Sequence, residues 1–225
     1  MSSFKPPFKP TATPLGLTDL RRDYAKGSLD ERTMTADPLA LLREWLDAAV
    51  VAKELEPNAM ALATVDAQGM PNVRTVLCKG IDARGILFYT NYRSHKGQEL
   101  EANPRAALDF FWRETSRQTR VQGTVEKVDP SESDAYFRLR PRGSQLGAWV
   151  SDHQSAPVTR QELDARLARL EKDFEGRDVE RPPFWGGYRV IPTRFEFWLG
   201  GPGRVHDCIA YEPDGEGWTR VRVSP

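Results

Sequence analysis

Two closely spaced hairpin signals in the first half of the chain constrain its fold more than any other feature. Three segments there, AMALATV (59–65), VRTVLCK (73–79) and ILFYTN (86–91), are rich in the apolar and β-branched residues that favour strands. Short turns ending at Gly69 and Gly85 separate them. Because short turns of this kind join strands that run in opposite directions, the sequence predicts an antiparallel meander.

Later segments repeat the strand pattern. The predicted strands are AALDFFW (106–112), QTRVQGTVEKV (118–128), RVIP (189–192), FEFW (195–198), VHDCIAY (205–211) and WTRVRV (218–223). A Trp-Gly-Gly turn (185–187) is expected before the FEFW strand, and a turn at 213–215 before the last one.

Helices are predicted between these strands. Asp37 suits an N-cap and Pro38 the first helical position, and apolar residues follow at helical spacing. Other predicted helices cover 17–27, 94–103, 130–140 and 159–174, the last beginning with a Thr159–Glu162 capping box. Six or more antiparallel strands with inserted helices indicate a mainly β protein of the α+β class, a small β-barrel with helical covers.

The composition suits a soluble globular protein. We expect residues 1–16 to form a disordered, proline-stiffened tail and residues 17–225 to form a single domain. The 32 basic residues equal the 32 acidic ones, which argues against nucleic-acid or membrane-surface partners. No apolar run approaches the ~18 residues of a membrane span, and the first residues lack a signal-peptide core, so a cytoplasmic location is expected.

Metal and disulfide chemistry find little support in the sequence. Cys78 and Cys208 form no metal-binding pattern and are too few for a disulfide scaffold. The three histidines, His95, His153 and His206, accompany no cluster of carboxylates. A catalytic metal site is therefore not expected.

Basic residues form the first candidate site. Arg74 and Lys79 lie on one predicted strand, Lys96 opens the helix after it, and Arg140 and Arg204 come later. Arginine and lysine bind phosphate, and a helix N-terminus adds backbone N–H donors. Alternatively, these side chains are ordinary solvated charges. Strict strand alternation places Arg74 and Lys79 on opposite faces, so they serve different ligands unless a bulge intervenes.

Tyr136, Arg140 and Ser144 form a second candidate, an anion pocket. Tyr136 and Arg140 are four residues apart and share a helix face, and Ser144 follows the turn at 141–143. A tyrosine packed against an arginine stem is the alternative.

Aromatic and titratable residues near the C-terminus form the third candidate. Arg204 and His206 are two apart on a predicted strand and so point the same way. Trp198 precedes them beside glycines, where it can wall a planar ligand. Most of the other aromatic rings are better explained by core or dimer-interface packing.

The segments that carry these residues resemble the pyridoxamine 5′-phosphate oxidase family, from about Leu20 to the C-terminus. The matching segments are LRRDY (20–24), EPNAMALATVD (56–66), RTVLCK (74–79), FYTNYRSHKGQEL (88–100), RPRGSQLGAWVS (140–151), FWGGYRV (184–190) and EFWLGGPGRVHD (196–207). The resemblance implies an antiparallel split β-barrel that binds FMN at the interface of a homodimer. It also implies oxidation of pyridoxamine or pyridoxine 5′-phosphate to pyridoxal 5′-phosphate, with O₂ reduced to H₂O₂.

The resemblance assigns roles to individual positions. The implied FMN contacts are Arg74, Thr75, Val76, Leu77, Cys78, Lys79, Tyr89, Thr90, His95, Lys96, Gln118, Gln154, Ser155, Trp198 and Cys208. The implied substrate contacts are Arg21, Tyr24, Lys79, Tyr136, Arg140, Ser144, Arg204 and His206. Of these, Arg204 and His206 are the residues that lie over the substrate ring and act in catalysis.

One position departs from the family pattern. Cys208 stands where the family has an arginine that contacts the flavin. Losing a charge-assisted hydrogen bond costs about 1.5–3 kcal/mol, so weaker FMN binding is expected. Two alternatives remain: a related flavin oxidase acting on another substrate, as in phenazine biosynthesis, and a non-catalytic flavin or pyridoxal-phosphate carrier.

Overall fold

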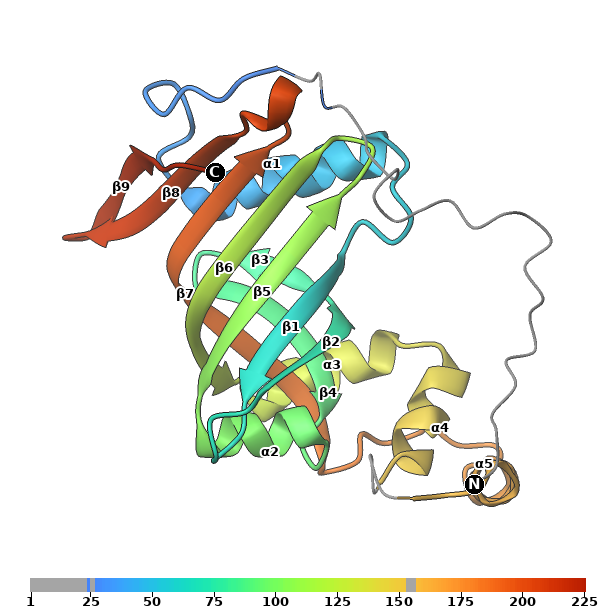
Figure 1. Ribbon diagram of the computed structural model, residues 1–225. Coiled ribbons are helices and arrows are strands. Elements are labelled where there is room, and N and C mark those ends of the chain that lie inside the picture. Colours follow the sequence, from blue (N-terminus) through green and yellow to red (C-terminus); the bar gives the residue numbers. More distant parts are fainter. Residues whose placement is uncertain (1–23, 25–26, 153–156) are drawn as a thin grey trace, which may run out of the picture.

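A computed structural model describes Tyr24, residues 27–152 and residues 157–225 (Figure 1). The strands are β1 Ala59–Val65, β2 Pro71–Leu77, β3 Gly80–Asp82, β4 Gly85–Asn91, β5 Arg105–Trp112, β6 Arg117–Lys127, β7 Trp185–Leu199, β8 Asp207–Asp214 and β9 Gly217–Arg222. The helices are α1 Pro38–Val51, α2 His95–Ala102, α3 Pro130–Leu139, α4 Arg142–Val150 and α5 Arg160–Asp173.

All nine strands join one antiparallel sheet that curls into a half-barrel, as the split-barrel prediction requires. The order is β2-β1-β5-β6-β7-β4-β3, with β8 paired to β7 and β9 to β8. In Figure 1, α1 crosses the sheet near the Leu199 end of β7, and α2 lies at its Trp185 end. The two ends of β7, at Trp185 and at Leu199, are the reference points for the candidate sites.

The predicted simple meander is wrong, because β2 and β4 lie toward opposite edges of the sheet instead of pairing. The chain passes between them at two residues that bond to different strands. The Cys78 N–H donates to the Asn58 carbonyl beside β1 (2.8 Å), and the Lys79 N–H donates to the Leu87 carbonyl in β4 (2.8 Å). This crossing curls the sheet, and it ends β2 at Leu77 rather than at the predicted Lys79.

The main core lies between the inner face of the sheet and α1. Asp37 caps α1 by accepting a hydrogen bond from the Leu39 N–H, and Pro38 opens the helix, both as predicted. Trp45 of α1 packs edge-on against Phe197 of β7, with ring centroids 5.1 Å apart. Removing such apolar surface from water is the main stabilising term in folding.

A second apolar cluster lies at the Trp185 end of β7. Phe137, Leu146, Val179, Phe184 and Trp185 are its largest buried members. They join α3, α4 and the segment before β7 to the barrel. This cluster supports one of the candidate sites.

Several predicted elements differ from the structure. RVIP and FEFW belong to one continuous strand, β7, which also contains the predicted Trp-Gly-Gly turn. The segment 204–206 is not a strand, since Pro202–Arg204 is a 3₁₀ turn and β8 begins at Asp207. The predicted turn at 141–143 is instead the start of helix α4.

Of the other predicted helices, three are confirmed and one lies almost entirely outside the described residues. Those at 94–103, 130–140 and 159–174 are confirmed as α2, α3 and α5, and the capping box of α5 is present. The predicted helix at 17–27 and the tail at 1–16 lie outside the described residues, except that Tyr24 and Gly27 are not helical. No helix in the described ranges is long and apolar enough to cross a membrane.

Candidate functional site

Arg74 is fixed by a buried carboxylate on the helix opposite. It extends from β2 and donates from Nη2 to Glu99 Oε2 of α2 at 3.0 Å, and from Nη1 to the Thr64 hydroxyl. Glu99 is 7% exposed and also accepts from Thr64 (2.5 Å) and from the Asn72 amide (2.6 Å). Arg74 Nε makes no hydrogen bond within the described residues, so its guanidinium retains a donor for a further anion.

Lys96 lies close enough to Arg74 for their charges to repel. Among the residues that the structure describes, the hydrogen-bond partners of its Nζ are the hydroxyls of Thr90 and Ser94, each at 3.3 Å. Burial, followed by the positive charge of Arg74, lowers the pKa of Lys96. Ser94 caps α2, so the free N–H groups of its first turn lie beside this ammonium. Two cations at a helix N-terminus suit a phosphate.

Three aromatic rings stack on one another near the Trp185 end of β7. Tyr89 of β4 lies 4.0 Å from Tyr136 of α3 and 5.5 Å from Trp185 of β7, measured between ring centroids. The guanidinium carbon of Arg140 lies 4.5 Å from the centroid of the Trp185 ring. Arg140 Nη1 is buried and has no hydrogen-bond partner among the described residues. Burial lowers the pKa of Arg140 and raises that of Tyr136.

An unpartnered buried N–H on a cation is costly, and native proteins usually satisfy such groups. Arg140 is held over an aromatic face with one donor unused. Together with Tyr136 it forms a candidate anion cradle, in which Arg140 is the C-cap residue of α3 and not part of the helix. Ser144 lies on the exposed first turn of α4, just after Arg140 in the chain.

Two glycines allow the rings and α3 to approach β7. A Cβ on Gly186 would lie 2.0 Å from the Tyr92 hydroxyl, and one on Gly187 would lie 2.7 Å from the Tyr89 ring. Neither clash is tolerable. The Trp-Gly-Gly sequence is thus explained by close packing at the cradle.

A second ring cluster lies at the Leu199 end of β7. Trp198 and His206 have centroids 4.7 Å apart, and Tyr24 packs edge-on against both, at 5.5 and 5.7 Å. The Gly201 N–H donates to His206 Nδ1 (3.1 Å), which leaves Nε2 to carry the proton of the neutral ring. Arg204 is exposed with φ of 67°, so a turn, not strand alternation, brings it close to His206.

The sheet register aligns three predicted flavin residues in one row. Gln118 of β6 pairs with Trp198, and Trp198 pairs with Cys208 of β8. Cys208 is 2% exposed, and burial raises the pKa of its thiol. The three residues lie far apart in the sequence, so this row could not be predicted from local patterns. It results from the pairing of β6, β7 and β8.

The remaining predicted residues divide between several environments. Thr75 and Lys79 are exposed, whereas Val76 packs against the main core. The Cys78 side chain is buried in that core, and burial raises its pKa to about 11, so any cofactor contact from it would use main-chain atoms. Leu77 is half-buried at the end of β2, and His95 is exposed at the start of α2. Arg21, Gln154 and Ser155 lie outside the described residues.

The predicted site residues gather at two separate places in one chain. Arg74, Tyr89, Thr90, Lys96, Tyr136 and Arg140 lie toward the Trp185 end of β7, whereas Gln118, Trp198, His206 and Cys208 lie toward the Leu199 end. Trp185 and Trp198 are 13 positions apart, a span of roughly 40 Å in a straight strand.

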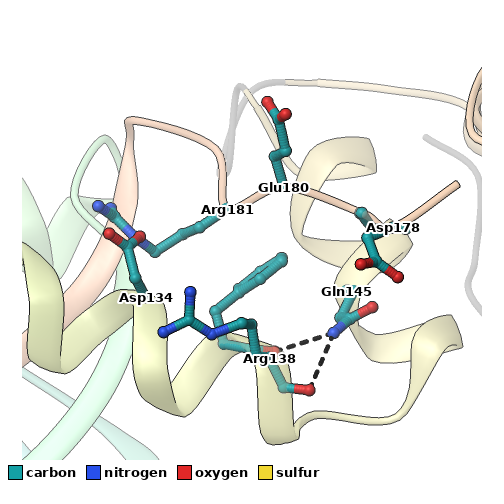
Figure 2. Close-up of a pocket in the computed structure, with 8 residues that line it drawn as sticks. Asp134, Arg138, Gln145, Asp178, Glu180 and Arg181 are labelled. Carbon is teal, nitrogen blue, oxygen red and sulfur yellow. Dashed lines mark hydrogen bonds and ion pairs between the residues drawn. The ribbon is translucent and has the colours of Figure 1, made fainter.

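A cavity of about 520 Å³ lies behind the cradle, between α3, α4 and residues 178–181 (Figure 2). Phe137 and Val179 line it, and the Gln145 amide caps the end of α3 by donating to the Phe137 and Arg138 carbonyls. Arg181 and Asp134 pair across its edge at 2.6 Å. The cavity contains none of the predicted site residues.

The sequence patterns did not indicate a role in the candidate site for two residues, Trp185 and Glu99. Trp185 was expected to be a turn residue, yet its ring supports Arg140. Glu99 was not singled out, because a glutamate inside a helix is usually solvated. No local pattern distinguished it from its neighbour Glu101, which is exposed.

Two family models and a curated relative match most of this chain. A family model described as pyridoxamine 5′-phosphate oxidase matches residues 46–172, and one described as the pyridoxine 5′-phosphate oxidase C-terminal dimerisation region matches residues 185–225. A pyridoxine/pyridoxamine 5′-phosphate oxidase from Rubrobacter xylanophilus is 53% identical over 209 residues, covering 93% of this chain and 96% of its own.

Solved structures show the same fold. PhzG from Burkholderia lata, in complex with tetrahydrophenazine-1-carboxylic acid, has a TM-score of 0.82 and 33% identity, covering 88% of this chain and 100% of its own. A pyridoxamine 5′-phosphate oxidase-related, FMN-binding protein from Nostoc punctiforme has a TM-score of 0.69 and 17% identity, covering 85% of this chain and 100% of its own.

Proposed function

This chain belongs to the pyridoxamine 5′-phosphate oxidase family, and on that premise we propose that it is an FMN-dependent oxidase. Its substrates are pyridoxamine 5′-phosphate and pyridoxine 5′-phosphate, its product is pyridoxal 5′-phosphate, and O₂ is the electron acceptor. The relative from Rubrobacter xylanophilus, 53% identical, carries this substrate pair in its name. The activity serves the synthesis or salvage of the vitamin B6 coenzyme.

The observation that carries the proposal is the cradle around Arg140. Its buried Nη1 has no partner among the described residues, and Tyr136 stacks on Tyr89 beside it. A guanidinium binds a phosphate through paired N–H donors. Tyr136, Arg140 and Ser144 are therefore assigned to the substrate phosphate, and Lys79 reaches it from the crossing after β2.

The residues at the start of α2 fit the phosphate of FMN. Arg74 keeps a free donor, and the ammonium of Lys96 has only hydroxyl partners within the described part of the chain. Because Glu99 already pairs with Arg74, a bound phosphate would compensate the charge of Lys96 and accept a further hydrogen bond from Arg74. Arg74 and Lys96 would hold the phosphate of FMN, which would supply the two-electron redox chemistry for oxidising the amine or alcohol, with O₂ as the final acceptor and H₂O₂ as its product.

The protein's own contribution is to bind and orient. Two phosphate anchors fix the relative position of two planar rings, which places the reacting carbon against the flavin. Arg204 and His206 orient the pyridine ring from the opposite side. His206 Nε2 bears the ring proton, since Nδ1 accepts from Gly201, and so donates a hydrogen bond toward the substrate.

The complete site is assigned to a homodimer. The two groups of residues lie toward opposite ends of β7, a strand of 15 residues, and we infer that they do not meet around one flavin within a single chain. In a twofold-symmetric dimer, the Trp185 end of one copy meets the Leu199 end of the other. The match of residues 185–225 to a dimerisation region supports this assignment.

A second candidate is a related flavin oxidase that acts on a phenazine precursor. The likeness to PhzG, at a TM-score of 0.82, favours it. A tricyclic carboxylic acid lacks a phosphate, however, and would leave the Arg140 cradle only partly used. The non-catalytic carrier has only Cys208 in its favour.

Hydrogen peroxide production with a panel of substrates tests the proposal. We expect H₂O₂ with pyridoxamine 5′-phosphate and pyridoxine 5′-phosphate, and far less with unphosphorylated pyridoxamine, because the cradle then lacks its anion. Equal rates with and without the phosphate would contradict the role given to Arg140. Bound flavin with no peroxide from any B6 compound would favour the carrier.

A further inference from the structure

Of the cradle residues, Tyr136 belongs to α3 and Arg140 caps the C-terminal end of that helix, so the placement of α3 decides where the cradle lies. Three consecutive residues near the start of α3 attach it to the chain around β7. The Ser133 hydroxyl accepts from the Gly187 N–H at 3.0 Å, and Asp134 pairs with Arg181 at 2.6 Å. Glu132 makes the third attachment, to a buried arginine.

That arginine is Arg189 of β7, whose side chain is 1% exposed. Its Nη1 donates to both carboxylate oxygens of Asp82, at 2.6 and 2.7 Å, and its Nη2 donates to Glu132 Oε2 at 3.0 Å. The more exposed Arg84 forms ion pairs with the same two carboxylates, Asp82 and Glu132, at 3.2 Å each. Asp82 and Arg84 belong to the β3–β4 hairpin.

The two carboxylates hold the same guanidinium but connect it to different elements. Asp82 connects it to the β3–β4 hairpin, and Glu132 connects it to α3. A buried guanidinium requires paired acceptors, and their geometry is fixed by the planar fork. The charges of Glu132 and Arg189 also act on the phenol of Tyr89, which Tyr136 stacks upon.

We propose that Glu132, held by the buried Arg189, is a positioning residue that sets the height of α3 on the barrel and thereby places Tyr136 and Arg140 for the substrate phosphate. Glu132 itself does not touch the substrate. The inference rests on the proposed function, because it assumes that the cradle receives a phosphate.

The experiment compares two variants of the holoenzyme that damage the same ion group. Glu132→Ala removes one of the three attachments of α3, the one made through Arg189, and keeps a residue that favours helix. Asp82→Asn weakens the other attachment of Arg189 and leaves α3 untouched. Each leaves Arg189 one of these two carboxylates as well as Glu126, whose Oε1 lies 4.0 Å from Arg189 Nε, so both are expected to fold. Dissociation constants for pyridoxal 5′-phosphate from equilibrium dialysis, KM, kcat and melting temperature are measured for each.

We expect Glu132→Ala to raise KM for pyridoxamine 5′-phosphate and the dissociation constant of pyridoxal 5′-phosphate by about tenfold, the effect of one lost charge-assisted hydrogen bond. The FMN dissociation constant and kcat should change little. Glu132→Gln, whose amide oxygen still accepts from Arg189, should recover part of the loss. Asp82→Asn should lower the melting temperature without changing KM.

Two results overturn the inference alone: ligand binding unchanged in Glu132→Ala despite a lower melting temperature, or an equal rise in KM in both variants. Either would give Glu132 a purely structural role. A wild-type protein that neither binds pyridoxal 5′-phosphate nor oxidises pyridoxamine 5′-phosphate would instead overturn the proposed function, and the inference with it.

Discussion

At the residue scale, we expect Lys96 to make FMN binding depend on pH. Burial and the charge of Arg74 both disfavour its ammonium, so its pKa in the folded chain falls below the usual 10.5. Between the lowered pKa and 10.5 the unfolded chain holds more protons, so the stability of the apoprotein rises with pH in that range. Below the range the cost of burying the charge is fully present.

A bound phosphate, in contrast to burial, favours the charged ammonium form of Lys96. We therefore expect the FMN affinity of the apoprotein to fall as pH rises through the lowered pKa of Lys96. Fluorescence titration with FMN at increasing pH measures this fall. Lys96→Arg keeps its charge throughout and should flatten the curve. An equally steep fall in that variant would show that another group titrates.

Cys208 makes the second prediction at this scale. It lies beside Trp198 in the row that includes Gln118, where its thiol offers no charged donor to a flavin. Cys208→Arg should bind FMN about ten to a hundred times more tightly, the value of one charge-assisted hydrogen bond. The matched control Cys78→Ser, at the other buried thiol, should not tighten FMN binding. Equal affinity of the wild type and Cys208→Arg would show that the cysteine is already compensated.

At the scale of elements, α3 and β4 can approach β7 closely because Gly186 and Gly187 of β7 have no side chains. Gly187→Ala would push a methyl group to 2.7 Å from the Tyr89 ring and so displace the stack that supports Tyr136. We expect a higher KM for pyridoxamine 5′-phosphate together with a lower melting temperature.

Gly147→Ala is the control for this substitution. Gly147 lies in α4, and a Cβ there meets nothing within 4 Å. Alanine in a helix is favoured over glycine by about 0.5–1 kcal/mol, so this variant should be slightly more stable with an unchanged KM. If Gly187→Ala behaved like Gly147→Ala, the packing around Tyr89 would not matter for binding.

Local chemistry in the sequence predicted the helices well. Asp37-Pro38, Ser94 and the Thr159–Glu162 pair fix helix starts through their own side chains, and each is confirmed. The wrong predictions concern segments whose structure depends on contacts with residues far away in the sequence. Gly186 and Gly187 were expected to form a turn, but Tyr89, Tyr92 and Ser133 pack against them within a strand. Such neighbours lie about a hundred residues away for the tyrosines and cannot be inferred from local propensity.

At the scale of the whole molecule, the sequence predicted the class of fold but not the strand order. The first hairpin and the turn of the second were predicted, but the strand before that second turn is β3, because the crossing at Cys78 and Lys79 sends β2 and β4 toward different edges. The residues of the candidate site were named through the family resemblance. Their separation into two groups along β7 follows only from the sheet register.

That separation predicts complementation between inactive variants. Arg140→Ala disables the Trp185 end of β7, and His206→Ala disables the Leu199 end. In mixed dimers one of the two shared sites would combine intact ends from both chains, so about a quarter of all sites should be intact after random reassortment. Oxidase activity should therefore return when the two proteins are unfolded together and refolded. No recovery, with mixed dimers demonstrated, would place each site within one chain.

The central claim is that this chain oxidises B6 phosphates through a bound flavin, and anaerobic reduction of that flavin tests it most directly. The purified protein, supplied with FMN if it is colourless, is mixed with pyridoxamine 5′-phosphate in the absence of O₂ while its visible spectrum is recorded. We predict that the flavin absorbance bleaches at once and returns when O₂ is admitted, with pyridoxal 5′-phosphate formed. A flavin spectrum that stays unchanged after substrate is added, or a protein that binds no FMN, would contradict the account.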